Sequence, residues 1–166
     1  MGRFYGMDRN KTWERTQLAY DAITQGRGEH QADDALAAVG QAYNRGESDE
    51  FIKPTIVDGY DGMHDGDAII FFNLRSDRAR QISKAFVQSD FEAANAATKA
   101  FHRSRVIRDL LFVTMTDFGP DLGDLLSAFP ALTINDTLPM VLQHHRQLYI
   151  AESEKYAHVT YFFNGG

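Results

Sequence analysis

The chain has 166 residues, and 43% of them are hydrophobic, which is enough for one sizeable buried core. Its formal charge of −6 excludes the large basic field of a nucleic-acid binder, and the absence of cysteine excludes disulfides and thiolate zinc sites. No apolar stretch approaches the roughly 20 residues that span a bilayer, and the N-terminus lacks the apolar core of a signal peptide. We therefore expect a soluble, cytoplasmic α/β protein that binds neither nucleic acid nor membrane.

The first part of the chain predicts a loop and two helices. The opening MGRFYGMDRN has too few apolar residues in register for a regular element, and its glycines indicate a shaped loop. A helix should begin at Asn10 or Thr12 and stop at Gly26. Its inner face should consist of Trp13, Thr16, Tyr20 and Ile23. A second helix fits residues 31–44 and ends at Gly46. Its inner face should consist of Leu36, Val39 and Tyr43.

The middle of the chain predicts parallel strands. Residues 51–57 indicate a short extended segment, in which Pro54 favours an edge position. Residues 68–72 and 110–115 are continuous apolar runs, the pattern of strands that are buried on both faces of a parallel sheet. We expect these two runs to lie in one sheet.

Two helices are predicted between those apolar runs. Ser76 or Asp77 is well placed to cap the first of them. Its inner face should consist of Ala79, Ile82 and Phe86. The second covers roughly residues 90–101. The residues that share its apolar face are Phe91, Ala94, Thr98 and Phe101.

The last quarter of the chain differs from the rest. Glycine and proline interrupt residues 116–132, as is typical of a boundary between structural units. Beyond it we expect a short helix at about residues 136–145 and strands at 147–151 and 159–163. If these strands are exposed, they favour association between copies of the chain.

These elements together predict a three-layer α/β fold with a largely parallel sheet. Residues 1–128 should form one main domain that is itself incomplete, and residues 129–166 should be a tail that belongs to a second domain. Both ends of the chain look like cuts through a larger protein.

The stretch FFNLRSDRARQI is a candidate anion site. Arg75 lies between a predicted strand and the helix that follows, and Arg78 is expected in the first helical turn, where the helix dipole disfavours a cation. Guanidinium groups match carboxylate and phosphate oxygens two at a time, so an anion would compensate that cost. The alternative is that Asp77 neutralises one arginine and the other faces solvent, and these residues alone leave the choice open.

The sequence contains no clear candidate for a metal site or for a catalytic nucleophile. The histidines are scattered through different predicted elements, and the adjacent pair His144 and His145 cannot easily share one metal ion on a helix. Neither Ser76 nor Ser153 has the sequence context of a catalytic nucleophile. Lys155 follows two glutamates, and a lysine in such acidic surroundings is more often a solvated charge than a phosphate ligand. We expect a chain that binds an anion and carries no metal ligands.

Three separated stretches nevertheless resemble one family. GRFYGMDR, DGDAIIFFNLRSDRARQI and IAESEKYAHVTYFFNGG are similar, in this order, to the cofactor-independent phosphoglycerate mutases, and FVTMTDF adds to the likeness. In that family a phosphatase-like domain carries two divalent metal ions and a serine that becomes phosphorylated, and an inserted transferase domain holds the glycerate. The resemblance implies that residues 1–128 are the later part of the transferase domain. Residues 129–166 would be the linker and first elements of the phosphatase domain.

The resemblance also implies roles for single residues. Arg3 and Arg9 match two arginines that contact the substrate, and Arg75 and Arg78 match a pair that grips it in the same cleft. Lys155 matches a catalytic lysine that reaches the phosphoryl group near the nucleophilic serine. We therefore expect a phosphoglycerate site in which phosphate is moved between two hydroxyl groups of glycerate in glycolysis.

The catalytic groups of that family have no match in this sequence. The metal-binding aspartates and histidines and the nucleophilic serine are absent, so this segment should bind neither manganese nor magnesium and should be inactive alone. Its natural partner would be the missing phosphatase domain of the same protein. Two alternatives stay open: a non-catalytic module that binds phosphate or carboxylate, and another phosphomutase of the alkaline phosphatase superfamily.

Overall fold

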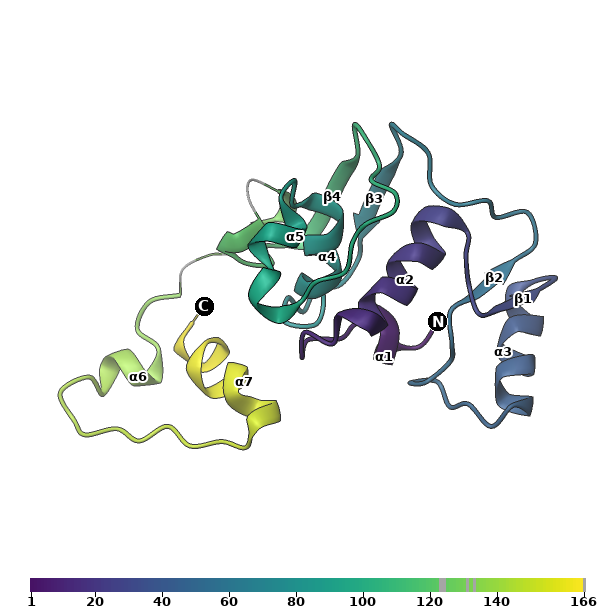
Figure 1. Ribbon diagram of the computed structural model, residues 1–166. Coiled ribbons are helices and arrows are strands. Elements are labelled where there is room, and N and C mark those ends of the chain that lie inside the picture. Colours follow the sequence, from purple (N-terminus) through teal and green to yellow (C-terminus); the bar gives the residue numbers. More distant parts are fainter. Residues whose placement is uncertain (123–124, 131, 133, 166) are drawn as a thin grey trace. The chain divides into compact units, whose positions relative to one another are not determined.

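The computed structural model describes residues 1–122, 125–130, 132 and 134–165. These residues form two compact units, unit 1 (Met1–Ala128) and unit 2 (Phe129–Gly166). The helices of unit 1 are α1 (Arg3–Gly6), α2 (Trp13–Gln25), α3 (Ala35–Asn44), α4 (Arg80–Val87), α5 (Phe91–Ala94), and the short 3-10 helices η1 (Ala96–Thr98) and η2 (Pro120–Leu122) (Figure 1). The strands are β1 (His30–Ala32), β2 (Thr55–Val57), β3 (Ala68–Phe71), β4 (Leu111–Thr116) and β5 (Leu126–Phe129).

The strands belong to two small sheets. Strands β1 and β2 pair in parallel and form a two-stranded sheet, whereas a three-stranded sheet has the order β3-β4-β5. In the larger sheet β3 and β4 are parallel, with Ala68 opposite Leu111 and Phe71 opposite Thr114. The predicted α/β class and parallel pairing are confirmed, with the strands divided between two sheets.

Helix α2 forms as its apolar spacing predicts. Trp13, Thr16 and Tyr20 are all at most 3% exposed, and they face the rest of unit 1. The helix ends because Gly26 adopts a left-handed conformation with φ of 62°, which glycine accepts without a steric cost. The opening segment, predicted as a loop, contains the short helix α1.

The main hydrophobic cluster joins α2 to α4 and α5. It consists of the buried residues Trp13, Tyr20, Ala85, Phe91 and Phe101. The rings of Trp13 and Phe91 meet edge to face at 5.2 Å, and the Tyr20 hydroxyl donates to the carbonyl of Arg105 at 2.7 Å. The predicted helix over residues 90–101 is present only as α5 and η1, because the backbone turns at Asn95 between them.

Helix α4 covers one face of the larger sheet. Its Phe86 ring lies 5.9 Å from that of Phe112 on β4, and Figure 1 shows α4 beside β3 and β4. The expectation that residues 68–72 are buried on both faces is wrong. Ile70 is 70% exposed and Phe72 is 75% exposed, because no described residue of unit 1 covers that face of β3.

Helix α3 packs in an orientation that differs from the prediction. Leu36 is 83% exposed and Tyr43 is 52% exposed, whereas Ala42 is fully buried against the small sheet. Small alanine side chains allow the helix to approach β1 and β2 closely, and the stripe of large apolar residues beside them is turned outward. The part of the predicted helix before Asp34 is instead strand β1, and Asp34 caps α3 by accepting from the amide of Ala37.

Unit 2 has helical turns where strands were predicted. Its elements are α6 (Leu138–Val141), η3 (Ser153–Lys155), α7 (Tyr156–Thr160) and η4 (Phe162–Asn164). The predicted strand at residues 159–163 is wrong because this segment lies in α7 and η4, and residues 147–151 have no regular structure. An extended segment needs a neighbour to satisfy its backbone, and no strand pairing is present for these two segments in the described part of the chain. The proposed association through tail strands loses its basis.

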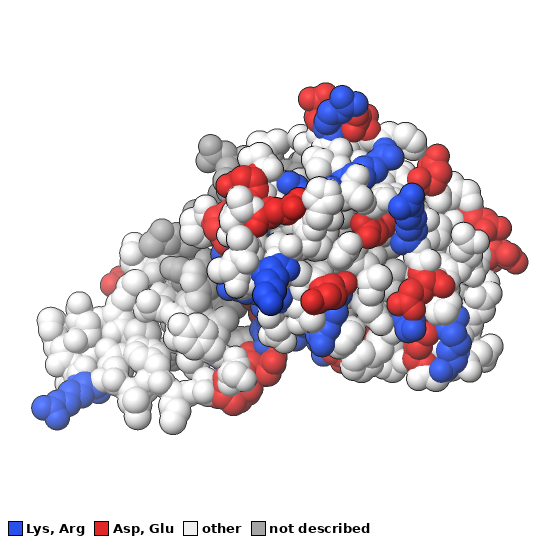
Figure 2. All heavy atoms as spheres, viewed as in Figure 1, with Lys and Arg blue, Asp and Glu red and all other residues white. Residues whose placement is uncertain are grey.

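Two further observations concern the lengths of the helices and the charge of the surface. Within the described ranges no helix is both long and apolar enough to cross a membrane. Figure 2 shows basic and acidic side chains interspersed over the visible face of the molecule. This view therefore contains no broad basic surface of the kind that attracts nucleic acid.

Candidate anion-binding site

Two irregular segments of unit 1 carry the arginines of the candidate site. Arg9 lies in the loop between α1 and α2, and Arg75 and Arg78 lie between β3 and α4. Helix α4 begins later than predicted: its N-cap is Ala79, which forms no side-chain cap. Arg78 therefore precedes the first helical turn, and the carboxylate of Asp77 is available for the arginines.

Asp77 joins the two segments. Its Oδ2 accepts from Arg9 Nη1 at 2.6 Å, and its two oxygens accept from Arg75 Nε and Nη2 at 2.7 and 2.9 Å. The side chains of Arg9 and Asp77 are only 16% and 13% exposed, whereas that of Arg75 is 50% exposed. Of the pair Arg75 and Arg78, Asp77 binds Arg75, as the simpler alternative has it, and it binds Arg9 as well.

Arg78 adds a third guanidinium to the same neighbourhood. Its Nη1 donates to the carbonyl of Met7 at 3.3 Å, in the loop that carries Arg9. Three guanidinium groups therefore lie around the carboxylate of Asp77. Planar groups that bind oxygens in pairs suit a small anion with more than one negative charge.

Two of the residues predicted for the site have other surroundings. Arg3 lies on α1, and its Nη2 contacts Glu50 Oε2 at 3.2 Å, with half of the arginine side chain exposed. Lys155 belongs to unit 2, in η3, and its Nζ lies 3.6 Å from Glu152 Oε1 on an exposed surface. The structure thus brings three of the four arginines together and leaves the roles of Arg3 and Lys155 as predictions.

Sequence reasoning missed two buried polar residues beside the arginines. Asp8 is 5% exposed and accepts from the backbone amides of Asn10 and Thr12, just before α2 begins. Gln81 on α4 is also 5% exposed, and its side chain donates to Asp8. An aspartate a few residues before a helical pattern is a capping signal, so Asp8 was detectable. Nothing in the sequence indicated Gln81.

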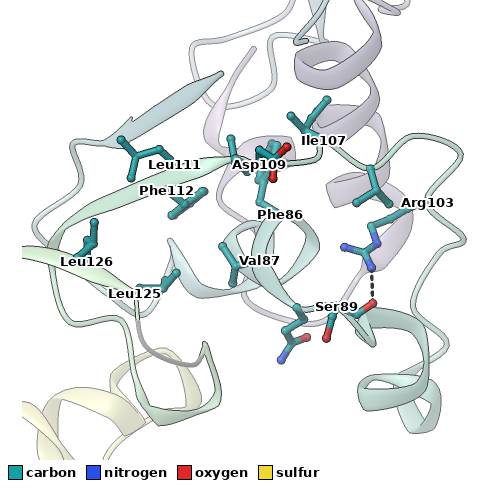
Figure 3. Close-up of a pocket in the computed structure, with 13 residues that line it drawn as sticks. Phe86, Val87, Ser89, Arg103, Ile107, Asp109, Leu111, Phe112, Leu125 and Leu126 are labelled. Atoms are coloured by element: carbon teal, nitrogen blue, oxygen red, sulfur yellow. Dashed lines mark hydrogen bonds between the residues drawn. The ribbon is translucent and has the colours of Figure 1, made fainter. Parts of the chain in front are cut away.

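A separate pocket in unit 1 has a different character. It has a volume of about 490 Å³ and lies between α4, β4 and the start of β5 (Figure 3). Most of its lining is apolar: Phe86, Val87, Val106, Ile107, Leu110, Leu111, Phe112, Leu125 and Leu126. Arg103 at its edge is engaged with backbone, since it donates to the carbonyls of Ala85 and Ser89 at 3.0 and 3.1 Å. This pocket is not suited to a multiply charged acid.

The residues present do not fit a metal site. In the ranges that the structure describes, no three histidine, cysteine or carboxylate side chains are grouped so that they would hold a metal ion. Any metal chemistry of a longer protein would need ligands from another part of its chain.

Acidification is expected to weaken the arginine cluster. Burial raises the pKa of Asp77, but the hydrogen bonds from Arg75 and Arg9 and their charges outweigh burial, and the pKa lies below its ordinary value of 3.8. A carboxyl group with a lowered pKa stabilises the fold above its unfolded pKa, and this stabilisation is lost as the pH falls through the folded value. The difference in unfolding free energy between the wild type and Asp77→Asn should therefore shrink below about pH 4.

Urea denaturation at a series of pH values measures this difference. Asp33→Asn, at an exposed position before α3, is the matched control and should show a small difference at every pH. A difference for Asp77→Asn that stays constant down to about pH 2 contradicts the proposed ionic link.

The comparisons with known proteins identify the family of the chain. Residues 1–120 match the family model described as the BPG-independent PGAM N-terminus. The chain is 45% identical over 172 aligned residues to the 2,3-bisphosphoglycerate-independent phosphoglycerate mutase of Serratia proteamaculans and 44% identical to that of Yersinia pseudotuberculosis. All of this chain is covered in both cases, but only 32% of each relative, so the chain spans about a third of their length.

A solved structure gives the same result. A phosphoglycerate mutase of Leishmania mexicana, determined at low cobalt concentration, is 27% identical and superimposes with a TM-score of 0.78. The match covers 99% of this chain and 30% of that one. The chain belongs to the BPG-independent phosphoglycerate mutase family.

Proposed function

We propose that this chain supplies substrate-binding arginines of a phosphoglycerate mutase that interconverts 3-phosphoglycerate and 2-phosphoglycerate. The observation that supports this most directly is the convergence of Arg9, Arg75 and Arg78 from two segments about 70 residues apart on one small region around Asp77. The relatives of similar sequence carry the mutase name, and their chains are about three times as long.

The arginines suit the chemistry of a mutase. During such a reaction the glycerate must stay in place between two phosphoryl transfers, and its carboxylate and phosphate are both anionic. Guanidinium groups that bind these oxygens in pairs prevent escape and fix the orientation of the acid. The cluster would also favour the charge that develops on the transferring phosphoryl group.

Asp77 has a defined place in this proposal. It holds Arg9 and Arg75 at one point before the substrate arrives, so less side-chain entropy is lost when the anion binds. Its single negative charge cannot match that of phosphoglycerate, which carries a carboxylate and a phosphate. The substrate therefore competes successfully for the exposed donors of Arg75.

Arg3 and Lys155 would join the substrate in the complete protein. Both now make ion pairs on the surface, Arg3 with Glu50 and Lys155 with Glu152. Exposed pairs of this kind contribute little free energy, so the two side chains are easily redirected towards a stronger anion. Lys155 would then act at the phosphoryl group, as the family resemblance implies.

The remaining machinery would come from the rest of a longer protein. We propose that unit 1 is the later part of its transferase domain and that unit 2 begins its phosphatase domain. That second domain would supply the serine nucleophile and two divalent metal ions, manganese or magnesium. The natural setting would be glycolysis in the cytoplasm. The present chain should bind phosphoglycerate without turnover.

Calorimetric titration of the chain with 3-phosphoglycerate tests this proposal. Glycerol 3-phosphate, which lacks the carboxylate, is the matched ligand control and should bind more weakly. An enzymatic assay for 2-phosphoglycerate should detect no product. Absence of binding contradicts the proposed site, turnover by the chain alone contradicts the assignment of the catalytic groups, and equal binding of both ligands favours a general phosphate-binding module.

A further inference from the structure

A buried hydrogen-bond network lies directly behind the arginine cluster. Its centre is Asp8, whose side chain is 3% exposed. Asp8 Oδ2 accepts from the amides of Asn10 and Thr12 at 3.1 and 2.9 Å and from Gln81 Nε2 at 2.9 Å. Its Oδ1 accepts from Arg15 Nη1 at 3.3 Å. A buried carboxylate is costly unless it is surrounded by donors, and these four bonds meet that requirement.

Gln81 extends the network from α4 to the loop. Its Oε1 accepts from the amide of Lys11 at 2.8 Å, and its Nε2 donates to Thr16 Oγ1 on α2 at 2.7 Å as well as to Asp8. One glutamine therefore contacts the loop, α2 and its own helix together. Both Gln81 and Thr16 are buried, so water cannot replace these bonds.

The network fixes the segment that carries Arg9. Three backbone amides of the loop, those of Asn10, Lys11 and Thr12, are bound by Asp8 or Gln81. Lys11 has a φ of 60°, a conformation that a lysine rarely adopts without such support. Arg9 directly precedes these residues, between Asp8 and the first bound amide.

The same network is tied to the other arginines through α4. Gln81 lies on the first turn of that helix, three residues after Arg78 and six after Arg75. The position of Gln81 relative to Asp8 thus sets the distance between the loop that carries Arg9 and the segment that carries Arg75 and Arg78. An apolar pair at this place would pack equally well but would not fix a single arrangement of the loop.

We propose that Asp8 and Gln81 are positioning residues that hold Arg9 in register with Arg75 and Arg78 before any anion binds. The inference rests on the proposed function, since it explains how that site is preorganised. Without the network the loop has more conformations, and only a fraction of the molecules presents all three arginines at once. If this fraction falls to about a tenth, the apparent affinity for the anion falls about tenfold.

The variant that tests this is Gln81→Met, which keeps the length of the side chain and removes its hydrogen bonds. Gln88→Met is the matched control, because Gln88 caps the other end of α4 and its side chain bonds to Asp121 and Asn95. Both variants should lower the midpoint of urea unfolding. Only Gln81→Met should weaken binding of 3-phosphoglycerate about tenfold, and Gln88→Met should stay within about twofold of the wild type.

A second readout needs no ligand. The guanidinium signals in nitrogen-15 NMR spectra, Nη–Hη for Arg9 and Nε–Hε for Arg75, report whether the pair is held at Asp77. The Arg9 signal should move to the position of a solvated arginine in Gln81→Met and remain in place in Gln88→Met. If the wild type does not bind 3-phosphoglycerate, the proposed function fails, and the Arg9 signal still decides whether the network positions that side chain.

The outcomes that overturn the proposal are specific. An unchanged Arg9 signal in a folded Gln81→Met chain shows that the network only stabilises the fold. The same conclusion follows if Gln81→Met and Gln88→Met bind 3-phosphoglycerate with equal affinity. If Gln81→Met does not fold, Asp8→Asn keeps the size of the side chain and removes the charge that accepts from the loop amides and from Gln81. A displaced Arg9 signal in Asp8→Asn supports positioning, and an unchanged signal contradicts it.

Discussion

Replacing Arg75 by alanine is expected to weaken binding of 3-phosphoglycerate to this chain about 10- to 100-fold. A hydrogen bond to a charged group contributes about 1.5–3 kcal/mol, and tenfold in affinity corresponds to about 1.4 kcal/mol. Of the two arginines that bind Asp77, Arg75 is more exposed than Arg9, so an arriving anion reaches the donors of Arg75 first. Its removal also takes one guanidinium group away from Asp77.

The fold should tolerate this change. The side chain of Arg75 is half exposed, and its hydrogen bonds are to Asp77, two residues away. Exposed ion pairs typically contribute up to about 1 kcal/mol to stability. Urea denaturation of Arg75→Ala should therefore give a midpoint close to that of the wild type, while calorimetry shows the loss of affinity.

Arg27→Ala is the matched control for Arg75→Ala. It removes the same charge from an exposed position just after α2, and the loop that carries Arg9 lies just before that helix. The 13 residues of α2 place Arg27 about 20 Å from the loop that carries Arg9. At this distance salt screens most of the electrostatic interaction. Equal losses of affinity in both variants show that general charge, and not the arginine cluster, attracts the ligand. Arg75→Lys separates the contribution of charge from that of the planar guanidinium, and it should recover only part of the affinity.

A longer mutase that includes this segment offers the stronger functional test. Arg75→Ala should lower its turnover with little effect on folding, because the glycerate would no longer be held between the two transfers. Turnover that equals the wild type removes Arg75 from the proposed site.

Local pattern was enough to predict the helices and strands of unit 1 that are built on regular spacing. Trp13, Thr16 and Tyr20 recur on one face of α2. The apolar runs that contain β3 and β4 are too continuous to be typical of surface loops, so they indicate strands. Both signals depend on neighbours along the chain, so no knowledge of tertiary contacts is needed to read them.

The predictions that failed concern which face is covered, and by what. The pattern of α3 contains a stripe of large apolar residues beside a stripe of alanines, and periodicity alone does not show which of them meets the sheet. Similarly, Ile70 lies in an apolar run typical of a buried strand but is exposed, because no described residue of unit 1 covers it. Among the described residues of unit 2 no strand pairs with the β-forming residues near Val159, and local helical bonds such as that from the Tyr161 amide to the Ala157 carbonyl replace the predicted ladder.

The candidate site could be predicted only in part for the same reason. The two arginines near α4 were detectable from their position after a strand, since ligands collect there in α/β sheets. Their meeting with Arg9 depends on packing of α2 against α4, and the family resemblance, not the spacing, indicated it. Gln81 had no signal at all, because a glutamine in a helix is ordinary until Asp8, 73 residues away, is placed beside it.

Phe91→Ala is expected to lower the unfolding free energy of unit 1 by about 3–5 kcal/mol. Phe91 is fully buried, and its ring lies 5.2 Å from Trp13 and 5.1 Å from Phe101, with the Arg103 guanidinium 5.1 Å above it. Alanine leaves a cavity between rings that are fixed by α2 and by the segment after η1, so the site cannot collapse around the smaller side chain. Natural domains have a total stability of about 5–15 kcal/mol, so the loss is a large fraction of what holds the unit together.

Trp13 provides a direct measurement of this loss, because it is the single tryptophan of the chain and touches the substituted ring. Its fluorescence in a urea titration should show an earlier midpoint for Phe91→Ala. Phe72→Ala is the matched control, since Phe72 is 75% exposed and its truncation should change stability by no more than about 0.5 kcal/mol. Equal losses in the two variants mean that the cluster around Phe91 is not the core that holds α2 against α4. In that case the arrangement that brings Arg9 to Arg75 must be stabilised mainly by the buried polar network between Asp8 and Gln81, and Gln81→Met should then unfold the chain more readily than Phe91→Ala.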